Sequence, residues 1–333
     1  MDSLTQIILG AAVGEAVLGR KVGNKAILWG AIAGTIPDLD VLCNLFFDAV
    51  TSNEVHRGFS HSIVFSLLFA PALGWLVYRF YGKKESSWKG WTKLMFWSLF
   101  THPLLDVHTT WGTQLLWPLE YKFSFKNIFV VDPLYTIPFL LFLMFAVFQK
   151  KGTPKRAKLN QCGLVISSAY MILTLIFKWI TYDVFVENLK IQEIAYTELE
   201  TKPTPLNSIL WSANVDTEDA YLIGYYSLFD TNRPISFLRV PKNHDLLGDL
   251  KNDPLIHRLI KLSKGWYTIE KKEEKLYFND LRFGLMGISP DERRFVFSYE
   301  LINDNGLRAV ETPKNTSEVK LQLKALFERV KGI

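Results

Sequence analysis

Apolar stretches of roughly membrane-spanning length fill the first 182 residues. They cover residues 4–19, 25–47, 60–81, 94–117, 133–149 and 161–182. A helix needs about 20 mainly apolar residues to cross the hydrocarbon core of a bilayer. Polar groups interrupt three of the stretches, and such groups are tolerated at that depth only where they are buried in protein or line a wet cavity. The pattern predicts an α-helical integral membrane bundle of about six segments.

Small residues in the first two stretches favour close packing of two helices, because they let the backbones approach. They are Gly10, Ala11, Ala12, Gly14, Gly30, Ala31, Ala33 and Gly34. Glu15 lies among them, and an acid at that depth should find a partner or a proton. We therefore treat Glu15 as a candidate catalytic residue.

The pattern changes after residue 186, where short apolar runs with strand character are separated by Asp, Asn, Pro and Gly. The runs are Ser208–Val215, Tyr221–Phe229, Ile235–Val240, Leu276–Leu285 and Phe295–Ile302. Helical patterns follow at about 254–263 and at Ser317–Val330, where Ser317 is suited to capping. The sequence predicts a polytopic membrane domain at 1–186 and a soluble α+β domain at 187–333.

Composition supports this division. The 333 residues are 49% hydrophobic with a mean hydropathy of +0.10, too apolar on average for an ordinary soluble enzyme and too charged to be membrane throughout. Residues 1–186 hold 17 Lys and Arg against 11 Asp and Glu, whereas residues 187–333 hold 21 against 22. Two cysteines, Cys43 and Cys162, form no disulfide framework. The start lacks a basic region, so no cleavable signal peptide is expected.

Basic residues gather in alternate connections between the apolar stretches, at 20–25, 79–93 and 150–158. The other connections carry only Arg57, Lys122 and Lys126. The positive-inside rule then predicts that the amino terminus and the carboxy-terminal domain lie outside the cytoplasm. Nucleic-acid binding is not expected, because the basic residues form clusters beside membrane segments and not a stripe.

Ionisable side chains recur in these apolar stretches, although each costs about 2.5 kcal/mol or more at membrane depth. Asp38 and Asp40 follow Pro37, where the backbone can turn both carboxylates toward one centre. The alternative is that one of them caps a helix. His102 and Asp106 are four residues apart, and hence on one face of a helix. The alternative here is a helix cap beside a first-turn charge.

A further pair of histidines opens the third stretch. In His56-Arg57-Gly58-Phe59-Ser60-His61, Gly58 allows a tight turn and Ser60 is suited to capping, so the two imidazoles can converge. Neutral imidazole is a common zinc ligand, and Arg57 between the pair could hold an anionic substrate. The alternative is two interfacial histidines with an arginine that meets lipid headgroups.

Because all these residues map to one depth and one side, we expect a shared divalent metal site, with zinc as the leading metal and one or two ions bound. The expected ligands are Asp38, Asp40, His56, His61, His102 and Asp106, with Arg57 and Glu15 as catalytic candidates.

These motifs, in this order, resemble a known family. Met1-Asp2-Ser3-Leu4-Thr5-Gln6, Ile36-Pro37-Asp38-Leu39-Asp40, the histidine motif at 56–62 and His102-Pro103-Leu104-Leu105-Asp106 are similar to the bacterial YdjM/YbcI-like family of membrane-bound, metal-dependent hydrolases. The resemblance spans about residues 1–135 and implies a bacterial inner membrane protein with a metal site. Family members often carry a histidine where this chain has Gln6, and whether Gln6 replaces a ligand stays open.

The functional prediction is a membrane-embedded, metal-dependent hydrolase that acts on a lipid phosphoester or another amphipathic ester through metal-activated water. Membrane lipid is the expected partner, and the sequence does not set the oligomeric state. Two alternatives stay open. One is a transporter for a divalent metal or protons, in which the same ligands form a transit site. The other is an anchor or receptor with a structural metal.

Overall fold

The computed structural model describes residues 1–231, 234–286, 294–304, 306–313 and 319–332. The chain divides into two compact units. The first, the helical unit, contains Met1–Leu45, Val55–Ile176 and Pro205–Ser208. The second, the sheet unit, contains Phe46–Glu54, Phe177–Thr204 and Ile209–Ile333.

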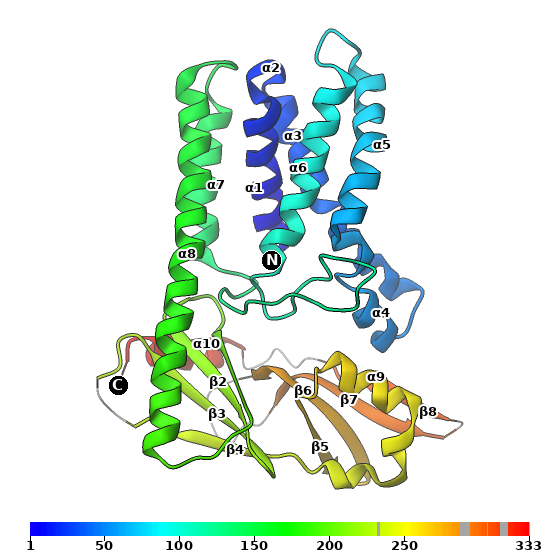
Figure 1. Cartoon of the computed structure of the whole chain (residues 1–333), viewed down its shortest axis with the longest axis vertical. Helices are drawn as coiled ribbons and strands as arrows, with labels where there is room; N and C mark the ends of the chain where they lie inside the picture. Colours follow the sequence, from blue (N-terminus) through cyan, green and yellow to red (C-terminus); the bar gives the residue numbers. More distant parts are fainter. Residues whose placement is uncertain (232–233, 287–293, 305, 314–318, 333) are drawn as a thin grey trace. The chain divides into compact units, whose positions relative to one another are not determined.

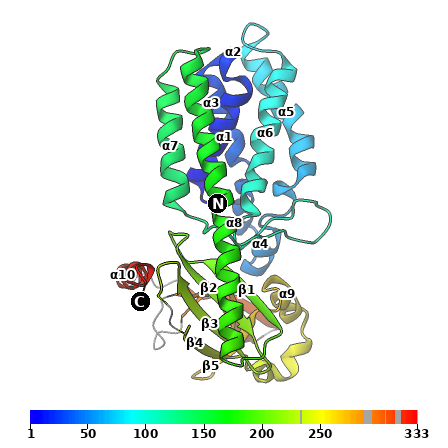
Figure 2. The same ribbon diagram turned by 60° about the vertical axis from the view of Figure 1, so that its left-hand side comes forward.

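Long helices run side by side in the helical unit (Figures 1 and 2). They are α1 (Ser3–Gly14), α3 (Asn24–Thr35), α5 (Ile63–Tyr81), α6 (Trp88–Asp106), α7 (Pro133–Val147) and the first part of α8 (Pro154–Ile191). Shorter turns join them, namely the π-helix η1 (Glu15–Gly19), α2 (Arg20–Val22) and the 3₁₀ helices η2 (Pro37–Leu45) and η3 (Phe59–His61).

The expectation of about six spanning segments is not supported. Within the described residues, only α5 and α8 are long and apolar enough to cross a membrane, and α3 with η2 would make a third span despite a 45° bend between them. The other stretches fall short for local reasons. α7 has 15 residues, α1 ends at Gly14, and α6 carries Lys89, Lys93 and Asp106. The apolar stretches in the sequence are therefore longer than the continuous apolar helices that they form.

Glycines bring α1 and α3 into backbone contact, which confirms the expected close packing. A Cβ on Gly10 would collide with the backbone of Gly30 and Gly34, and a Cβ on Gly14 would collide with Ala26 and Gly30. Glycine is therefore required where the helices cross.

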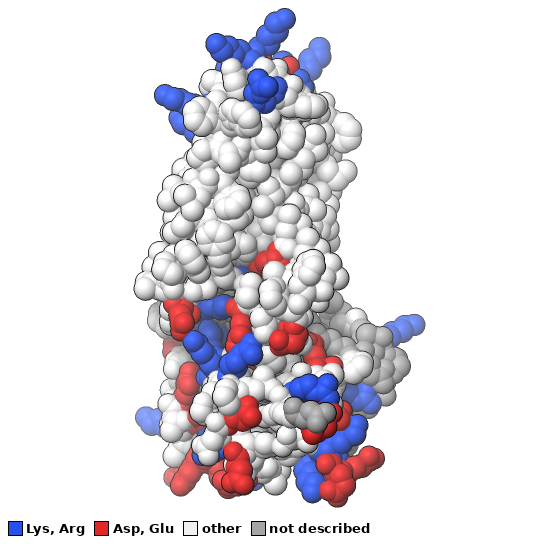
Figure 3. All heavy atoms as spheres, turned by 90° about the vertical axis from the view of Figure 1, so that its right-hand side faces the viewer, with Lys and Arg blue, Asp and Glu red and all other residues white. Residues whose placement is uncertain are grey.

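Lys and Arg side chains gather at one end of the helical unit, at the top of the view in Figure 3, above a broad band of surface that lacks charge. That end carries α2, the α5–α6 loop and the α7–α8 turn, as Figure 1 shows. The opposite end holds residue 1 and the end of α6.

Caps fix where the helices begin near this opposite end. Asp132 accepts hydrogen bonds from the backbone N–H groups of Leu134 and Tyr135 and so caps α7. Ser62, and not Ser60, caps α5 by accepting from the Phe65 N–H. Ser60 is thereby left to contact the residues around His61.

The sheet unit contains two four-stranded antiparallel sheets. The first has the order β1 (Glu198–Pro203), β2 (Leu210–Asp216), β3 (Ala220–Ser227), β4 (Phe237–Pro241), and the second β5 (Tyr267–Lys272), β6 (Lys275–Leu285), β7 (Phe295–Asn303), β8 (Leu307–Glu311). Its helices are α4 (Ala49–Val55), η4 (His244–Asn252), α9 (Pro254–Leu262) and α10 (Val319–Val330). The last part of α8 covers one face of the first sheet, where Phe185 and Leu189 pack on Trp211 and Ala213.

All five predicted strands are confirmed, as are the helices at α9 and α10, while the predicted cap Ser317 lies outside the described residues. Three strands were missed: β1, β5 and β8. Each is an edge strand rich in charged residues, which hide the alternation of apolar and polar positions. Charges on an edge strand discourage pairing with another chain.

Candidate metal centre

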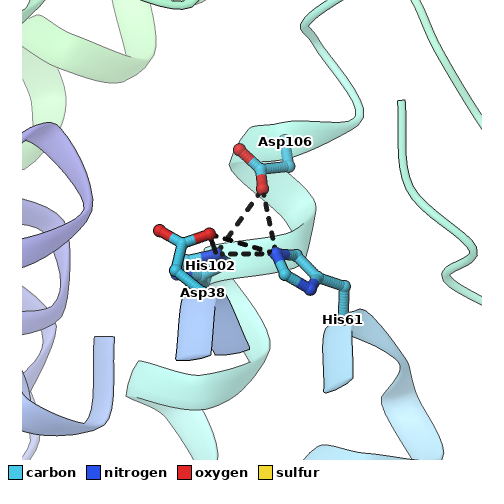
Figure 4. Close-up of side chains that lie close together, drawn as sticks. All are labelled: Asp38, His61, His102 and Asp106. Carbon is cyan, nitrogen blue, oxygen red and sulfur yellow. Dashed lines mark hydrogen bonds and ion pairs between the residues drawn. The ribbon is translucent and has the colours of Figure 1, made fainter. Parts of the chain in front are cut away.

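Four of the predicted ligands converge in the helical unit (Figure 4). Asp38 lies on η2, His61 on η3, and His102 and Asp106 on the last turns of α6. One ligand atom from each residue lies within 4.8 Å of the other three. We call these four residues the ligand cluster.

Distances within the ligand cluster are nearly uniform. The Nε2 atoms of His61 and His102 are 3.1 Å apart, and each lies 3.4 Å from Asp38 Oδ1. Asp106 Oδ2 is 3.4 Å from His61 Nε2 and 3.5 Å from His102 Nε2. Five of the six separations therefore fall between 3.1 and 3.5 Å.

These separations match a tetrahedral metal site. Zinc binds imidazole nitrogen and carboxylate oxygen at about 2.0–2.2 Å, so that neighbouring ligands of a regular tetrahedron lie about 3.3–3.6 Å apart. In an octahedron with the same bond length, adjacent ligands would be only about 3 Å apart. Five of the six separations are thus close to those of four-coordinate binding, and all four ligand atoms lie within 4.8 Å of one another.

Hydrogen bonds behind the histidines turn both Nε2 atoms toward the ligand cluster as acceptors. The Nδ1 of His102 lies 2.6 Å from the Gly34 carbonyl oxygen, to which it donates. The Nδ1 of His61 lies 3.0 Å from Ser60 Oγ and 3.4 Å from Asp40 Oδ2. A proton on each Nδ1 leaves a lone pair on each Nε2, the tautomer that binds metals when a second group holds the other nitrogen.

The donor set fits a cation. Two imidazole lone pairs 3.1 Å apart repel one another, as do the two carboxylates that flank them. Asp106 Oδ2 is buried and takes part in no hydrogen bond within the described part of the chain. A divalent ion would satisfy all four atoms together.

Asp40 and His56 are not part of the ligand cluster: Asp40 contacts His61, and His56 contacts Asp40. Asp40 Oδ2 accepts from the Arg57 N–H at 2.8 Å and from Ser60 Oγ at 3.2 Å, while its Oδ1 is 3.1 Å from His56 Nδ1. Burial lowers the pKa of His56 below its ordinary value. Asp40 is therefore placed to orient His61, as carboxylates behind metal-bound histidines do.

Arg57 contacts the cluster through Asp106. Its Nε lies 3.3 Å from Asp106 Oδ2, and its Nη1 donates to Thr109 Oγ1 at 2.7 Å. The other carboxylate oxygen, Oδ1, accepts from Gln6 Nε2 at 3.0 Å and pairs with the Met1 α-amino group. Gln6 thus holds a ligand in place from α1 and is not one of the four converging residues.

Glu15 is not brought to the ligand cluster. Arg156 donates to its two carboxylate oxygens, each at 2.7 Å, and both side chains are buried. Glu15 follows Gln6 by nine residues, a rise of about 13 Å along a helix. The acid has found the partner that its depth requires, and a catalytic part for it stays a prediction.

Sequence reasoning missed the groups that support the ligands. The Gly34 carbonyl was noticed only as part of a small-residue pattern, and Thr109 had no motif around it. Ser60 stood in a motif but was assigned to capping. Backbone carbonyls and hydroxyls of this kind leave no spacing signature, because their roles depend on contacts across helices.

Access to the ligand cluster is uneven. The side chains of His61, His102 and Asp106 have no exposed surface, whereas that of Asp38 is 24% exposed. Water or a substrate would therefore reach the centre past Asp38.

The fold and this centre define a class: a helical, membrane-type protein with a buried group of two histidines and two aspartates, joined to a unit of two antiparallel sheets. The comparison with protein families agrees. Residues 1–183 match the model of the YdjM inner membrane protein family, and the chain belongs to that family.

Two relatives extend the comparison. The Bacillus subtilis (strain 168) protein called uncharacterized protein YfhP is 27% identical over 347 aligned positions, which cover 97% of this chain and 98% of the relative. Inner membrane protein YbcI of Escherichia coli (strain K12) is 34% identical over 131 residues, which cover 37% of this chain and 74% of that protein. No solved structure matches the chain.

Proposed function

We propose that the protein is a membrane-embedded, metal-dependent hydrolase. The observation that carries this proposal is the ligand cluster, in which two imidazole nitrogens and two carboxylate oxygens converge at separations suited to one tetrahedral ion. Mixed nitrogen and oxygen ligands in this geometry favour zinc among the common divalent metals.

A bound zinc ion would supply a Lewis acid and lower the pKa of a coordinated water to about 7. Catalytic zinc sites typically keep three protein ligands and one position open to water or substrate. His61, His102 and Asp106 are the three buried members, and Asp38 lies at the exposed side. The four converging atoms describe the site without substrate; with substrate present, Asp38 would give up its position to water and would then be suited to accept a proton from that water.

Arg57 gives the site a means of binding an anion. Its buried Nε is held only by the ion pair with Asp106 Oδ2 at 3.3 Å, and it makes no hydrogen bond with the described residues. An arginine in this state can turn its N–H groups to the oxygens of a phosphoryl group. A phosphoester therefore suits the site better than a neutral ester.

The membrane character of the helical unit narrows the substrate class further. Family membership and the candidate apolar spans support a membrane location. The substrate we propose is a lipid phosphoester or a related amphipathic phosphoester, with membrane lipid as the partner of the helical unit.

The test is hydrolysis by the full chain in detergent, loaded with zinc and given phosphatidate in mixed micelles. Release of inorganic phosphate would be measured for the wild type, Asp38→Asn and His257→Ala. His257 is an exposed residue of α9 and serves as the matched control. Loss of the proton acceptor should lower kcat by about 10²–10⁴-fold.

Hydrolysis by the wild type and the control, with the loss in Asp38→Asn, would support the proposal. An equal rate in Asp38→Asn would contradict the part given to Asp38. If neither phosphatidate nor a phosphodiester lipid is hydrolysed by the zinc-loaded wild type, while zinc crosses proteoliposomes that contain it, the site belongs to a transporter.

A further inference from the structure

Apolar side chains are exposed immediately beside the ligand cluster. In η2, the helix that carries Asp38 and Asp40, Leu39, Val41 and Leu42 are each more than half exposed, and Leu45 is 75% exposed. We call these four residues the η2 rim. An exposed apolar patch on this scale marks a surface that meets a membrane or a protein.

Aromatic rings connect this region to a candidate membrane span. η2 packs against η3, where Phe59 lies two residues before His61. The Phe59 ring lies 5.5 Å from Phe65 and 6.3 Å from Phe69, both on α5, and 4.9 Å from Trp117. Phe59 and Trp117 are each 37% exposed. Exposed aromatic rings thus lie between the candidate span α5 and η3, the element that carries His61 and contacts η2.

The charge pattern also favours lipid over water or a folded partner. Between Asp40 and Asp48 the chain carries no charged residue, and this stretch includes Val41, Leu42 and Leu45 of the η2 rim. Tryptophan at the edge of such a surface is typical of the boundary between acyl chains and headgroups. The 45° bend after α3 turns η2 away from the axis of that helix, which suits a segment that lies within one leaflet better than one that crosses.

We propose that η2 is a re-entrant segment whose rim is embedded among the acyl chains of one bilayer leaflet. Asp38 and Asp40 begin this segment, so the lipid-embedded rim fixes the depth of the metal centre at the membrane surface. The inference concerns lipid contact and does not depend on the hydrolase proposal, because it would hold equally for a metal site without catalysis.

Cys43, within η2, is a native position for testing this. The full chain with Cys162→Ser would carry a nitroxide on Cys43, and a second protein, with Cys43→Ser and Cys162→Ser, would carry one on Leu45→Cys. Both would be placed in nanodiscs of phosphatidylethanolamine and phosphatidylglycerol. Collision of each label with oxygen, which concentrates in acyl chains, and with a water-soluble nickel chelate would be measured by electron paramagnetic resonance.

Two control positions calibrate the result in the same cysteine-free background. Leu68→Cys lies on the exposed surface of the span α5, and Lys84→Cys lies in the basic loop after it. We expect the ratio of oxygen to nickel collision at Cys43 and Leu45→Cys to approach that of Leu68→Cys. A ratio at both η2 positions equal to that of Lys84→Cys would overturn the proposal, whether or not the protein proves to be a hydrolase.

Discussion

The two carboxylate oxygens of Asp106 have different partners in the candidate metal centre. Its Oδ2 faces the two histidines, while its Oδ1 is held by Gln6 and the Met1 α-amino group. The spacing of His102 and Asp106 was enough to predict that they share a helix face. The partners of Oδ1 could not be predicted, because they come from residues 1 and 6, 105 and 100 positions away in sequence.

Loss of a metal ligand should weaken zinc binding more than loss of a residue that orients a ligand. His102→Ala should abolish stoichiometric zinc binding, because it deletes one of four donors. Asp40→Asn should weaken zinc affinity by about 10–100-fold, the usual cost of losing a carboxylate behind a metal-bound histidine. Competition with a zinc indicator would measure both. Equal losses in the two variants would show that Asp40 is itself a ligand.

Lys202 gives a prediction on pH in the sheet unit. It is buried, and its Nζ has no hydrogen-bond partner in the described part of the chain. Burial, opposed by the charge of Asp280 and reinforced by that of Arg282, lowers its pKa to about 7. Between pH 7 and about 10.4, the unfolded chain holds this proton and the folded chain does not, so stability rises with pH across that window.

Lys202→Met should therefore stabilise the protein at pH 7, and the gain should shrink toward pH 10. Thermal unfolding of the full chain in detergent at both pH values would measure it. Lys271→Met, at an exposed position of β5, is the control and should change little. A gain for Lys202→Met of the same size at both pH values would contradict the account of its burial.

At the scale of elements, the crossing of α1 and α3 depends on glycine. A Cβ on Gly30 would collide with the backbone of Gly10 and Gly14. Gly30→Ala should lower stability by about 1–3 kcal/mol, the usual cost of overpacking, despite the better helix propensity of alanine. The midpoint of thermal unfolding should fall. Ile32→Ala, an exposed site on the same helix, is the comparison, and an equal or smaller fall for Gly30→Ala would count against the close crossing.

The sequence predicted elements where a local pattern exists and failed where tertiary contacts decide. Alternation located the five more apolar strands, but not the charged edge strands such as β1. For the site, spacing indicated His61, His102, Asp38 and Asp106 together with Asp40 and His56. Spacing alone could not distinguish the four residues that converge from Asp40 and His56, which do not. The distinction depends on the 3₁₀ helices η2 and η3, because a 3₁₀ helix directs neighbouring side chains differently from an α-helix.

At the scale of the whole molecule, charge predicts orientation. The Lys and Arg of the first, third and fifth loops lie at one end of the helical unit (Figure 3), and we expect that end to face the cytoplasm. A cysteine at Lys84 should then resist a membrane-impermeant maleimide in intact cells, whereas one at Lys331 should react. The background would carry Cys43→Ser and Cys162→Ser. The reverse pattern would invert the topology.

The comparisons differ in how much of the chain they cover. YfhP aligns along nearly the whole chain, whereas the family match covers residues 1–183 and includes the ligand cluster but none of the strands. The candidate metal centre, which lies in the part that both comparisons cover, is thus the feature to test first.

Elemental analysis of the purified full chain tests the central claim most directly. We predict about one equivalent of a transition metal, foremost zinc, in the wild type and in the exposed-histidine control His257→Ala, and little in His61→Ala or His102→Ala. The folded state of each variant would be checked by its thermal unfolding. Wild-type protein that binds no metal after exposure to zinc, or folded His61→Ala and His102→Ala proteins that bind as much as the control, would contradict the account.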